Sequence, residues 1–143
     1  MAWYLDLTPC DYFGEALAPS LRAVGWLEPD HALSSKEKAD RAVYDKLTLL
    51  LREPWQPALL RGVHSCGFCQ FEPTRGSANV FIPGEGCVYV CPELILHYMN
   101  CHGYAPPPIF CAAVLTCPPM RSTGYFKALL KAGGRNLVSA RKS

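Results

Sequence analysis

Two cysteines and two histidines in residues 64–102 constrain the fold of this chain more than any other feature. Cys66 and Cys69 are separated by two residues, and His97 and His102 follow near the end of a segment that favours a helix. Two thiolates and two imidazoles form the donor set of a closed, tetrahedral zinc site. The pattern therefore predicts one structural Zn²⁺ ion bound by these four residues.

Two neighbouring residues compete for a place in this ligand set. Cys101 lies four residues after His97 and shares a helix face with it, while His64 stands two residues before the first cysteine. His97 and His102 are five residues apart, which on a regular helix separates them by about 140°. Both can bind one ion only if the last helical turn loosens, and Gly103 permits this.

The segments around the ligands predict an α+β fold. Residues 79–83 and 87–90 are rich in β-branched and aromatic residues and flank a Gly-rich turn, which predicts a β-hairpin. Pro92 and Gly103 stand where a helix begins and ends. Knuckle, hairpin and helix occur in the order of a ββα zinc finger, although a typical finger has only about a dozen residues between its second cysteine and first histidine. We therefore expect an enlarged finger-like unit.

About three further helices are expected to pack against this unit. Ser34 and Glu37 have the spacing of a capping box at the start of an apolar helical stripe. Two shorter helices are predicted over 109–116 and 125–132, and the aromatic N-terminal segment is expected to cover the core. At 143 residues, half of them hydrophobic, the chain suits one modest core, so we predict a single zinc-binding domain over residues 1–143.

Charge and hydrophobicity indicate location and partners. No apolar run is long enough to span a bilayer and the N-terminus lacks the features of a signal peptide, which predicts a cytoplasmic protein with reduced cysteines. Residues 121–143 carry +6 without an acid, whereas the whole chain carries +2. We predict a basic C-terminal helix and tail there. A solvated surface is the simpler interpretation, and an arm for nucleic acid or an acidic partner is the alternative.

Two motifs resemble those of a family of small, uncharacterised bacterial proteins. The first is the Gly-x-His-x-Cys-x-x-Cys knuckle at residues 62–69, and the second is Leu-Ile-x-His-Tyr…His-x-Tyr-x-Pro-Pro at residues 94–107. The likeness covers roughly residues 3–115. It implies that the family binds a metal through Cys66, Cys69, His97 and His102, with His64 as an extra member, and it implies no activity.

The chain departs from the family pattern at two places. Ala32-Leu33-Ser34 follows His31 where the family often has a Pro-aromatic and Gly turn, so no role is carried over to His31. The basic extension after Cys117 lies outside the likeness. A lone histidine such as His31, without a visible nucleophile, is expected to be structural.

A closed metal site leaves no coordinated water to activate, so we expect the metal to stabilise the fold. The leading hypothesis is a non-enzymatic, zinc-stabilised module that binds another protein, as bacterial immunity proteins do. Nucleic-acid binding is the alternative, although Asn100 is the only residue on the finger helix suited to reading bases. A zinc- or cysteine-dependent enzyme is the second alternative. It would need an open metal position or an activated thiol. Five further cysteines are expected to be buried apolar residues: Cys10, Cys87, Cys91, Cys111 and Cys117.

Overall fold

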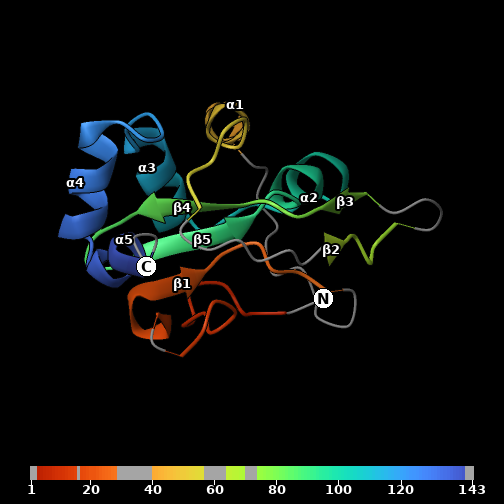
Figure 1. Cartoon of the computed structure of the whole chain (residues 1–143). Coiled ribbons are helices and arrows are strands. Elements are labelled where there is room, and N and C mark those ends of the chain that lie inside the picture. The colour runs from red at the N-terminus through yellow and green to blue at the C-terminus, as the bar shows by residue number, and fades with distance from the viewer. Residues whose placement is uncertain (1–2, 16, 29–39, 57–63, 70–73, 141–143) are drawn as a thin grey trace.

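The computed structural model describes residues 3–15, 17–28, 40–56, 64–69 and 74–140. Its helices are the 3-10 helix η1 (Ala18–Ser20), α1 (Arg41–Leu50), α2 (Ile95–Cys101), α3 (Pro108–Thr116), α4 (Thr123–Lys131) and α5 (Arg135–Ala140). Its strands are β1 (Leu21–Ala23), β2 (His64–Ser65), β3 (Arg75–Gly76), β4 (Asn79–Pro83) and β5 (Val88–Pro92). The described residues thus form the predicted α+β fold. The β2–β3 pair and α2 lie at one end of the molecule, and α4 and α5 lie at the other (Figure 1).

The predicted hairpin is confirmed, and it is part of a larger sheet. β4 and β5 pair antiparallel, and β1 adds to the other side of β5 in parallel, so the strand order is β1-β5-β4. Every residue of β5 and all but the last of β4 are buried. Both faces of the hairpin are therefore covered, which explains its nearly continuous apolar sequence. A finger-like unit standing alone would leave one of these faces in water.

The prediction that Pro92 begins the next helix is wrong. Pro92 is the last residue of β5 and lies opposite Asn79, and α2 begins at Ile95. The N–H of Glu93 donates to the carbonyl of Ala78, which makes Pro92 a non-hydrogen-bonded position toward β4. On the other side of β5, the last residue that pairs with β1 is Val90, so no described strand lies opposite the position where an N–H of residue 92 would point. Proline is tolerated there because no ladder hydrogen bond is lost.

The N-terminal segment covers the core, as its aromatic residues predict. Trp26 is fully buried, and its indole Nε1 donates to the carbonyl of Val90 at 3.0 Å. The ring centroids of Tyr4 and Tyr12 lie 5.5 and 5.0 Å from that of Trp26. Backbone hydrogen bonds from Leu7 and to Thr8 also run along β1. The segment therefore closes the edge of the sheet that β1 would otherwise leave open.

The helix that carries the predicted apolar stripe begins at Arg41, later than the capping-box spacing indicates. Asp40 is its N-cap, and the Asp40 carboxylate accepts a hydrogen bond from the N–H of Ala42 at 2.9 Å. Ser34 and Glu37 lie outside the described residues. The buried residues of this helix follow the predicted stripe: Val43, Leu47 and Leu50.

The C-terminal helices agree only in part with the helices predicted from the sequence. Either Ser122 or Thr123 is a suitable cap for α4 by sequence, and Ser122 is the cap, its hydroxyl accepting from the N–H of Tyr125 at 3.1 Å. The Gly133-Gly134 pair ends α4, but the chain then forms α5, which the sequence did not predict. The described residues therefore hold four α-helices besides α2, where about three were expected. The end of the basic tail, 141–143, lies outside the described residues.

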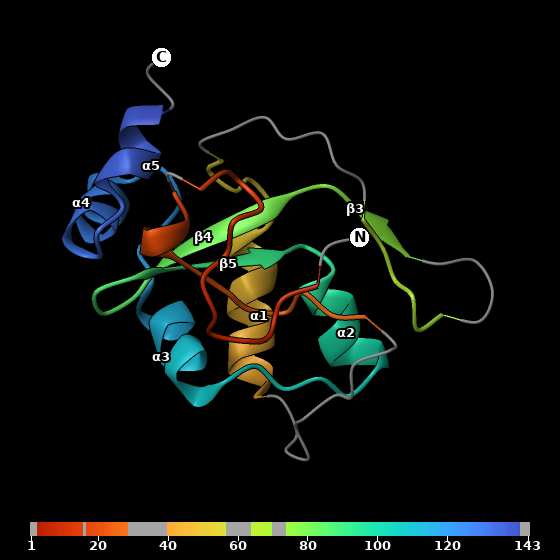
Figure 2. The same cartoon turned by 90° about the horizontal axis from the view of Figure 1, so that it is seen from below.

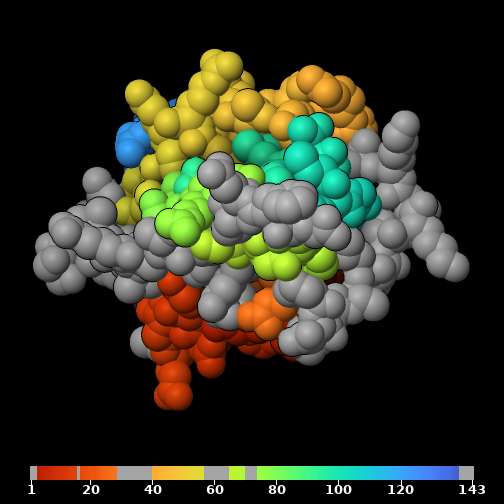
Figure 3. Space-filling model, turned by 90° about the vertical axis from the view of Figure 1, so that its right-hand side faces the viewer, coloured from red at the N-terminus to blue at the C-terminus, as the bar shows by residue number. Residues whose placement is uncertain are grey.

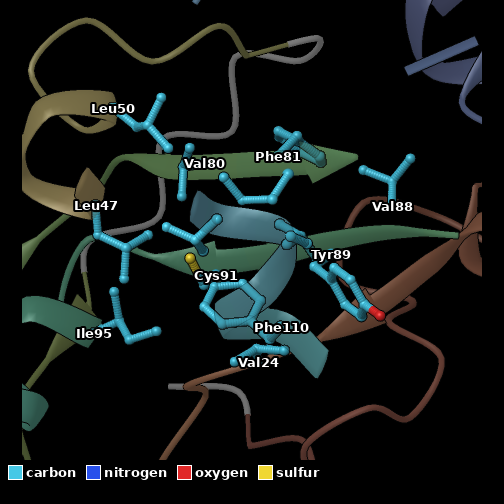
Figure 4. Packing of buried hydrophobic residues seen from close by; sticks show 14 of the residues in the cluster. Val24, Leu47, Leu50, Val80, Phe81, Val88, Tyr89, Cys91, Ile95 and Phe110 are labelled. Carbon is cyan, nitrogen blue, oxygen red and sulfur yellow. The ribbon is translucent and has the colours of Figure 1, made fainter. Parts of the chain in front are cut away.

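The core lies between the hairpin and three helices. Figure 2 shows α1, α2 and α3 on one side of β4 and β5. Figure 4 shows the residues that meet there: Leu47 and Leu50 from α1, Val80 and Phe81 from β4, Cys91 from β5, Ile95 from α2 and Phe110 from α3. Gly25 follows β1 at φ +79°, and an added Cβ would lie 3.0 Å from Ile95. This close approach seats α2 against the end of β1.

Candidate metal centre

The two cysteines lie at the end of a short β-ribbon. β2 pairs antiparallel with β3, and the next residue, Cys66, donates its N–H to the carbonyl of Thr74 at 2.8 Å. The backbone amides of Phe68 and Cys69 donate to the sulfur of Cys66. These amides hold the sulfur in place and favour its charged form, as expected for a tight Cys-x-x-Cys turn.

The two histidines lie on one side of α2 because the helix ends where predicted. His97 is on the helix, whereas His102 is its C-cap with φ −123° and ψ 10°, outside the helical range. Gly103 follows at φ +68°, in the left-handed region that ends many helices. The N–H of His102 still donates to the carbonyl of Tyr98 at 3.1 Å. The loosened turn removes the separation that a regular helix would impose on the two imidazoles.

These side chains converge to form what we call the Cys2His2 group: Cys66, Cys69, His97 and His102. Their four ligand atoms all lie within 4.8 Å of one another. The two Nε2 atoms are 3.1 Å apart, and the sulfur of Cys69 lies 3.2 Å from Nε2 of His97 and 3.7 Å from that of His102. The sulfur of Cys66 lies 3.3 Å from Nε2 of His102.

The spacing of these atoms suits a single tetrahedral ion. With Zn–S bonds of about 2.3 Å and Zn–N bonds of about 2.05 Å, a tetrahedron has an N···N edge of about 3.3 Å and S···N edges of about 3.6 Å. The observed N···N distance of 3.1 Å lies close to this value, and three of the four S···N distances, at 3.2 to 3.7 Å, lie close to theirs. All pairs of ligand atoms lie within 4.8 Å. The residues present therefore fit one metal ion of zinc size.

Burial shifts the pKa values of two residues in the group. Burial raises the pKa of the Cys66 thiol, and the neighbouring Cys69 adds to this effect. Burial also lowers the pKa of His97, and the charge of His102 lowers it further. A neutral imidazole is the form that binds metal. A divalent cation would supply the positive charge that stabilises the thiolates, so the group is suited to a cation that releases protons on binding.

The structure describes the side chain of one of the two predicted competitors for the ligand positions, Cys101. Cys101 is exposed, and the Cys2His2 group formed by the described residues does not include it. The sulfur of Cys101 instead lies 3.9 Å from the side-chain amide nitrogen of Asn100. The side chain of His64 and the whole of His31 lie outside the described residues.

Two further residues connect the ribbon to α2. The ring of Phe68 lies 5.3 Å from that of His102 and 6.0 Å from that of Tyr98, so it forms an apolar wall beside the group. Glu93, just before α2, accepts hydrogen bonds through Oε1 from the amides of Ser77 at 2.5 Å and Ala78 at 3.1 Å. Figure 3 views this end of the molecule, where the ribbon and α2 share one surface. The sequence did not predict these roles of Phe68 and Glu93, because no motif or spacing marks either residue.

The remaining cysteines do not form a second centre among the described residues. All eight cysteines are free, and Cys10, Cys91 and Cys117 are buried, as predicted, whereas Cys87 and Cys111 are only partly buried. Burial raises the pKa of Cys10 and of Cys117 to about 11. These two thiols are therefore uncharged at neutral pH and are weak nucleophiles.

The described cations of α4 and α5 lie at the surface. Lys127, Lys131 and Arg135 are all exposed, on α4 and at the start of α5. The buried residues of α4 are Tyr125 and Leu129, on the side that faces the sheet. In the part of the chain that the structure describes, no helix is both long and apolar enough to cross a membrane.

Comparison with known proteins gives one match. A family model described as a domain of unknown function (DUF7919) matches residues 2–115, which include the whole Cys2His2 group. No curated protein and no solved structure is significantly similar to the chain. The match agrees with the predicted resemblance to an uncharacterised family. It ends before α4, so the basic C-terminal segment lies outside it.

Proposed function

We propose that this chain, which belongs to the DUF7919 family, is a non-enzymatic binding module stabilised by one structural zinc ion. The convergence of Cys66, Cys69, His97 and His102 carries the proposal. Two sulfurs and two nitrogens that lie this close together favour zinc over harder cations. With four protein ligands, no position is open to water or substrate, so the ion stabilises the fold and takes no part in catalysis.

The position of the group explains why the fold would need the metal. The cysteines come from the ribbon and the histidines from α2, about thirty residues later in the chain. A metal that joins these two segments closes a long loop. Structural zinc contributes on the order of 10 kcal/mol in small domains, comparable with the whole stability of many proteins. We extend the proposal to one domain over residues 1–143 in a bacterial cytoplasm, where the thiols stay reduced.

A protein is the partner that α2 favours over DNA. A DNA-binding finger turns its helix toward the bases, whereas Ile95, Tyr98 and Met99 of α2 are buried in the core. Asn100 is exposed and is the only polar residue on the helix suited to reading bases. We therefore expect no salt-dependent binding to duplex DNA in an anisotropy titration.

Affinity capture from the source organism tests this function. The zinc-loaded full chain is immobilised beside the same chain treated with a chelator, and proteins recovered only by the zinc-loaded chain are purified and titrated against it by calorimetry. We expect a direct complex that forms with the zinc-loaded chain alone. If nothing binds the zinc-loaded chain, or if duplex DNA binds it and proteins do not, the proposed function is wrong.

A further inference from the structure

A surface hollow lies between the end of α1 and the segment that leads into α4. It has a volume of about 390 Å³. Leu49, Pro119 and Met120 supply apolar surface, and Lys46, Arg52 and Glu53 supply charge. The hollow lies outside the Cys2His2 group, and none of the features described so far accounts for it. Its size is at the lower end of the range for ligand sites in proteins.

Two long cationic side chains fix the walls of the hollow. Nζ of Lys46 donates to the carbonyl of Cys117 at 2.8 Å, which ties α1 to the end of α3. The guanidinium of Arg121 donates to the carbonyls of Glu53 at 2.8 Å and Pro54 at 3.3 Å. Both sides of the hollow are thus held in place before anything binds, which lowers the entropic cost of binding.

The backbone of Arg121 adds a second sign of constraint. Its φ is +63°, in the left-handed region that a residue with a side chain rarely adopts. Such a conformation is unfavourable for a residue with a side chain and persists only where the surrounding contacts determine it. The two hydrogen bonds to carbonyls supply those contacts. The backbone at Arg121 is therefore held in a less favoured conformation beside the hollow.

Among the described residues, no acid forms an ion pair with the positive charges around the hollow. Lys46 and Arg121 donate to backbone carbonyls, which carry no net charge, and Arg52 is exposed. Glu53 is the only acid among the described residues that line the hollow, against three cations at or beside it. Among the described residues one ion pair forms, between Arg41 and Asp45, and Arg41 is at the far end of α1.

Apolar surface lies beside this charge. Leu49 is 57 % exposed, although it belongs to the helix whose opposite face forms the core. Met120 and Pro119 stand across the hollow from it. No aromatic side chain lines the hollow among the residues that the structure describes, so nucleic-acid bases would find no stacking surface. The chemistry fits a peptide with an apolar anchor and negative charge.

We propose that this hollow binds an acidic segment of a partner protein. One apolar side chain of the segment lies against Leu49 and Met120, and its carboxylates face Lys46, Arg52 and Arg121. This assignment rests on the proposed function, because it names the surface through which the zinc-stabilised module binds a protein. Charge complementarity at the rim mainly accelerates association and selects the partner, and the apolar contact slows dissociation.

A peptide selection tests the proposal without knowledge of the natural partner. A phage library of random 12-residue peptides is selected on the zinc-loaded full chain, and enriched peptides are labelled with fluorescein and titrated by anisotropy. We expect an apolar residue within an acidic run. We also expect affinity to fall at least 10-fold in Arg52→Glu and in Leu49→Asp. The matched control Lys131→Glu, an exposed cation on α4 outside the hollow, should change affinity less than 3-fold.

A charge reversal makes the test sharper. A peptide whose acids are replaced by lysine should not bind the natural chain but should regain binding to Arg52→Glu. Circular dichroism and zinc content confirm that both exposed substitutions leave the fold intact. The proposal is wrong if no peptide is enriched or if the enriched peptides lack acids. It is also wrong if the peptides bind Arg52→Glu as tightly as the natural chain, or if oligonucleotides displace them from the same site.

The outcome also separates this proposal from the proposed function. A partner captured from the source organism by both the natural chain and Arg52→Glu would leave the binding module standing and refute the hollow as its surface. Capture of no partner by the natural chain would count against the proposed function itself. Loss of capture in Arg52→Glu, together with acidic peptides in the selection, would support both.

Discussion

Replacing Glu93 by alanine is expected to destabilise the zinc-loaded chain and to weaken zinc binding. One carboxylate oxygen of Glu93 accepts hydrogen bonds from two backbone amides, those of Ser77 and Ala78. A hydrogen bond to a charged acceptor contributes about 1.5–3 kcal/mol, and water can replace the more exposed of these two. We therefore expect a loss of about 2 kcal/mol in the free energy of unfolding.

The zinc affinity should fall because Glu93 connects the ribbon to α2. The amides that it binds follow β3, and Glu93 itself precedes the helix that carries both histidines. Residues that orient metal ligands indirectly typically change metal affinity by about 10- to 100-fold, and we expect the lower end for a contact this far from the ligands. Urea unfolding of the zinc-loaded chain gives the stability, and competition with a chromophoric chelator gives the affinity.

Two variants serve as controls for this prediction. Glu93→Gln keeps an acceptor oxygen but loses the charge, so it should lie between the natural chain and Glu93→Ala. Glu85→Ala removes an exposed acid from the turn of the hairpin and should change neither quantity. If Glu93→Ala behaves like Glu85→Ala in both assays, the carboxylate does not hold the ribbon against the helix and the reasoning is refuted.

Three other predictions follow from buried or exposed groups. Tyr125→Phe removes a buried hydrogen bond of 2.6 Å to a carbonyl of β4, and leaving that carbonyl unpaired should cost about 2 kcal/mol in urea unfolding; an unchanged midpoint would contradict this. Burial raises the pKa of Asp6, so the folded state keeps that proton to a higher pH than the unfolded state does. Stability should therefore fall as pH rises from about 4 through the raised pKa, and Asp6→Asn should flatten that part of the profile; a parallel profile would refute the assignment. A thiol reagent should label Cys101 first in the zinc-loaded chain and should reach Cys66 and Cys69 only after chelation; early labelling of those two would show that no metal protects them.

The metal group was predictable from sequence because its determinants are local. The Cys-x-x-Cys spacing defines a tight turn whatever surrounds it, and Gly103 marks the point where the helix loosens. His102 leaves the helix there, which is why two histidines five residues apart can meet. The hairpin was predictable for a similar reason, since its strands and turn differ sharply in composition.

The elements that were missed depend on contacts between distant residues. β2 and β3 are two residues each, too short for any periodicity, and they exist because they pair with each other. Pro92 has the local preference of a helix start, but its pairing with Asn79 extends β5 instead. Nothing in the neighbourhood of Glu93 indicates that its carboxylate binds amides sixteen and fifteen residues earlier in the chain. Such tertiary contacts override local propensity.

The metal content of the protein tests the central claim most directly. The chain is purified without added metal, and zinc per chain is measured by elemental mass spectrometry for the natural sequence, His102→Ala and Cys101→Ala. We expect one zinc per chain in the natural sequence and in Cys101→Ala, whereas His102→Ala should lose both its zinc and its folded circular dichroism signal. A well-folded natural chain that contains no zinc, and gains none when zinc is supplied, would contradict the account.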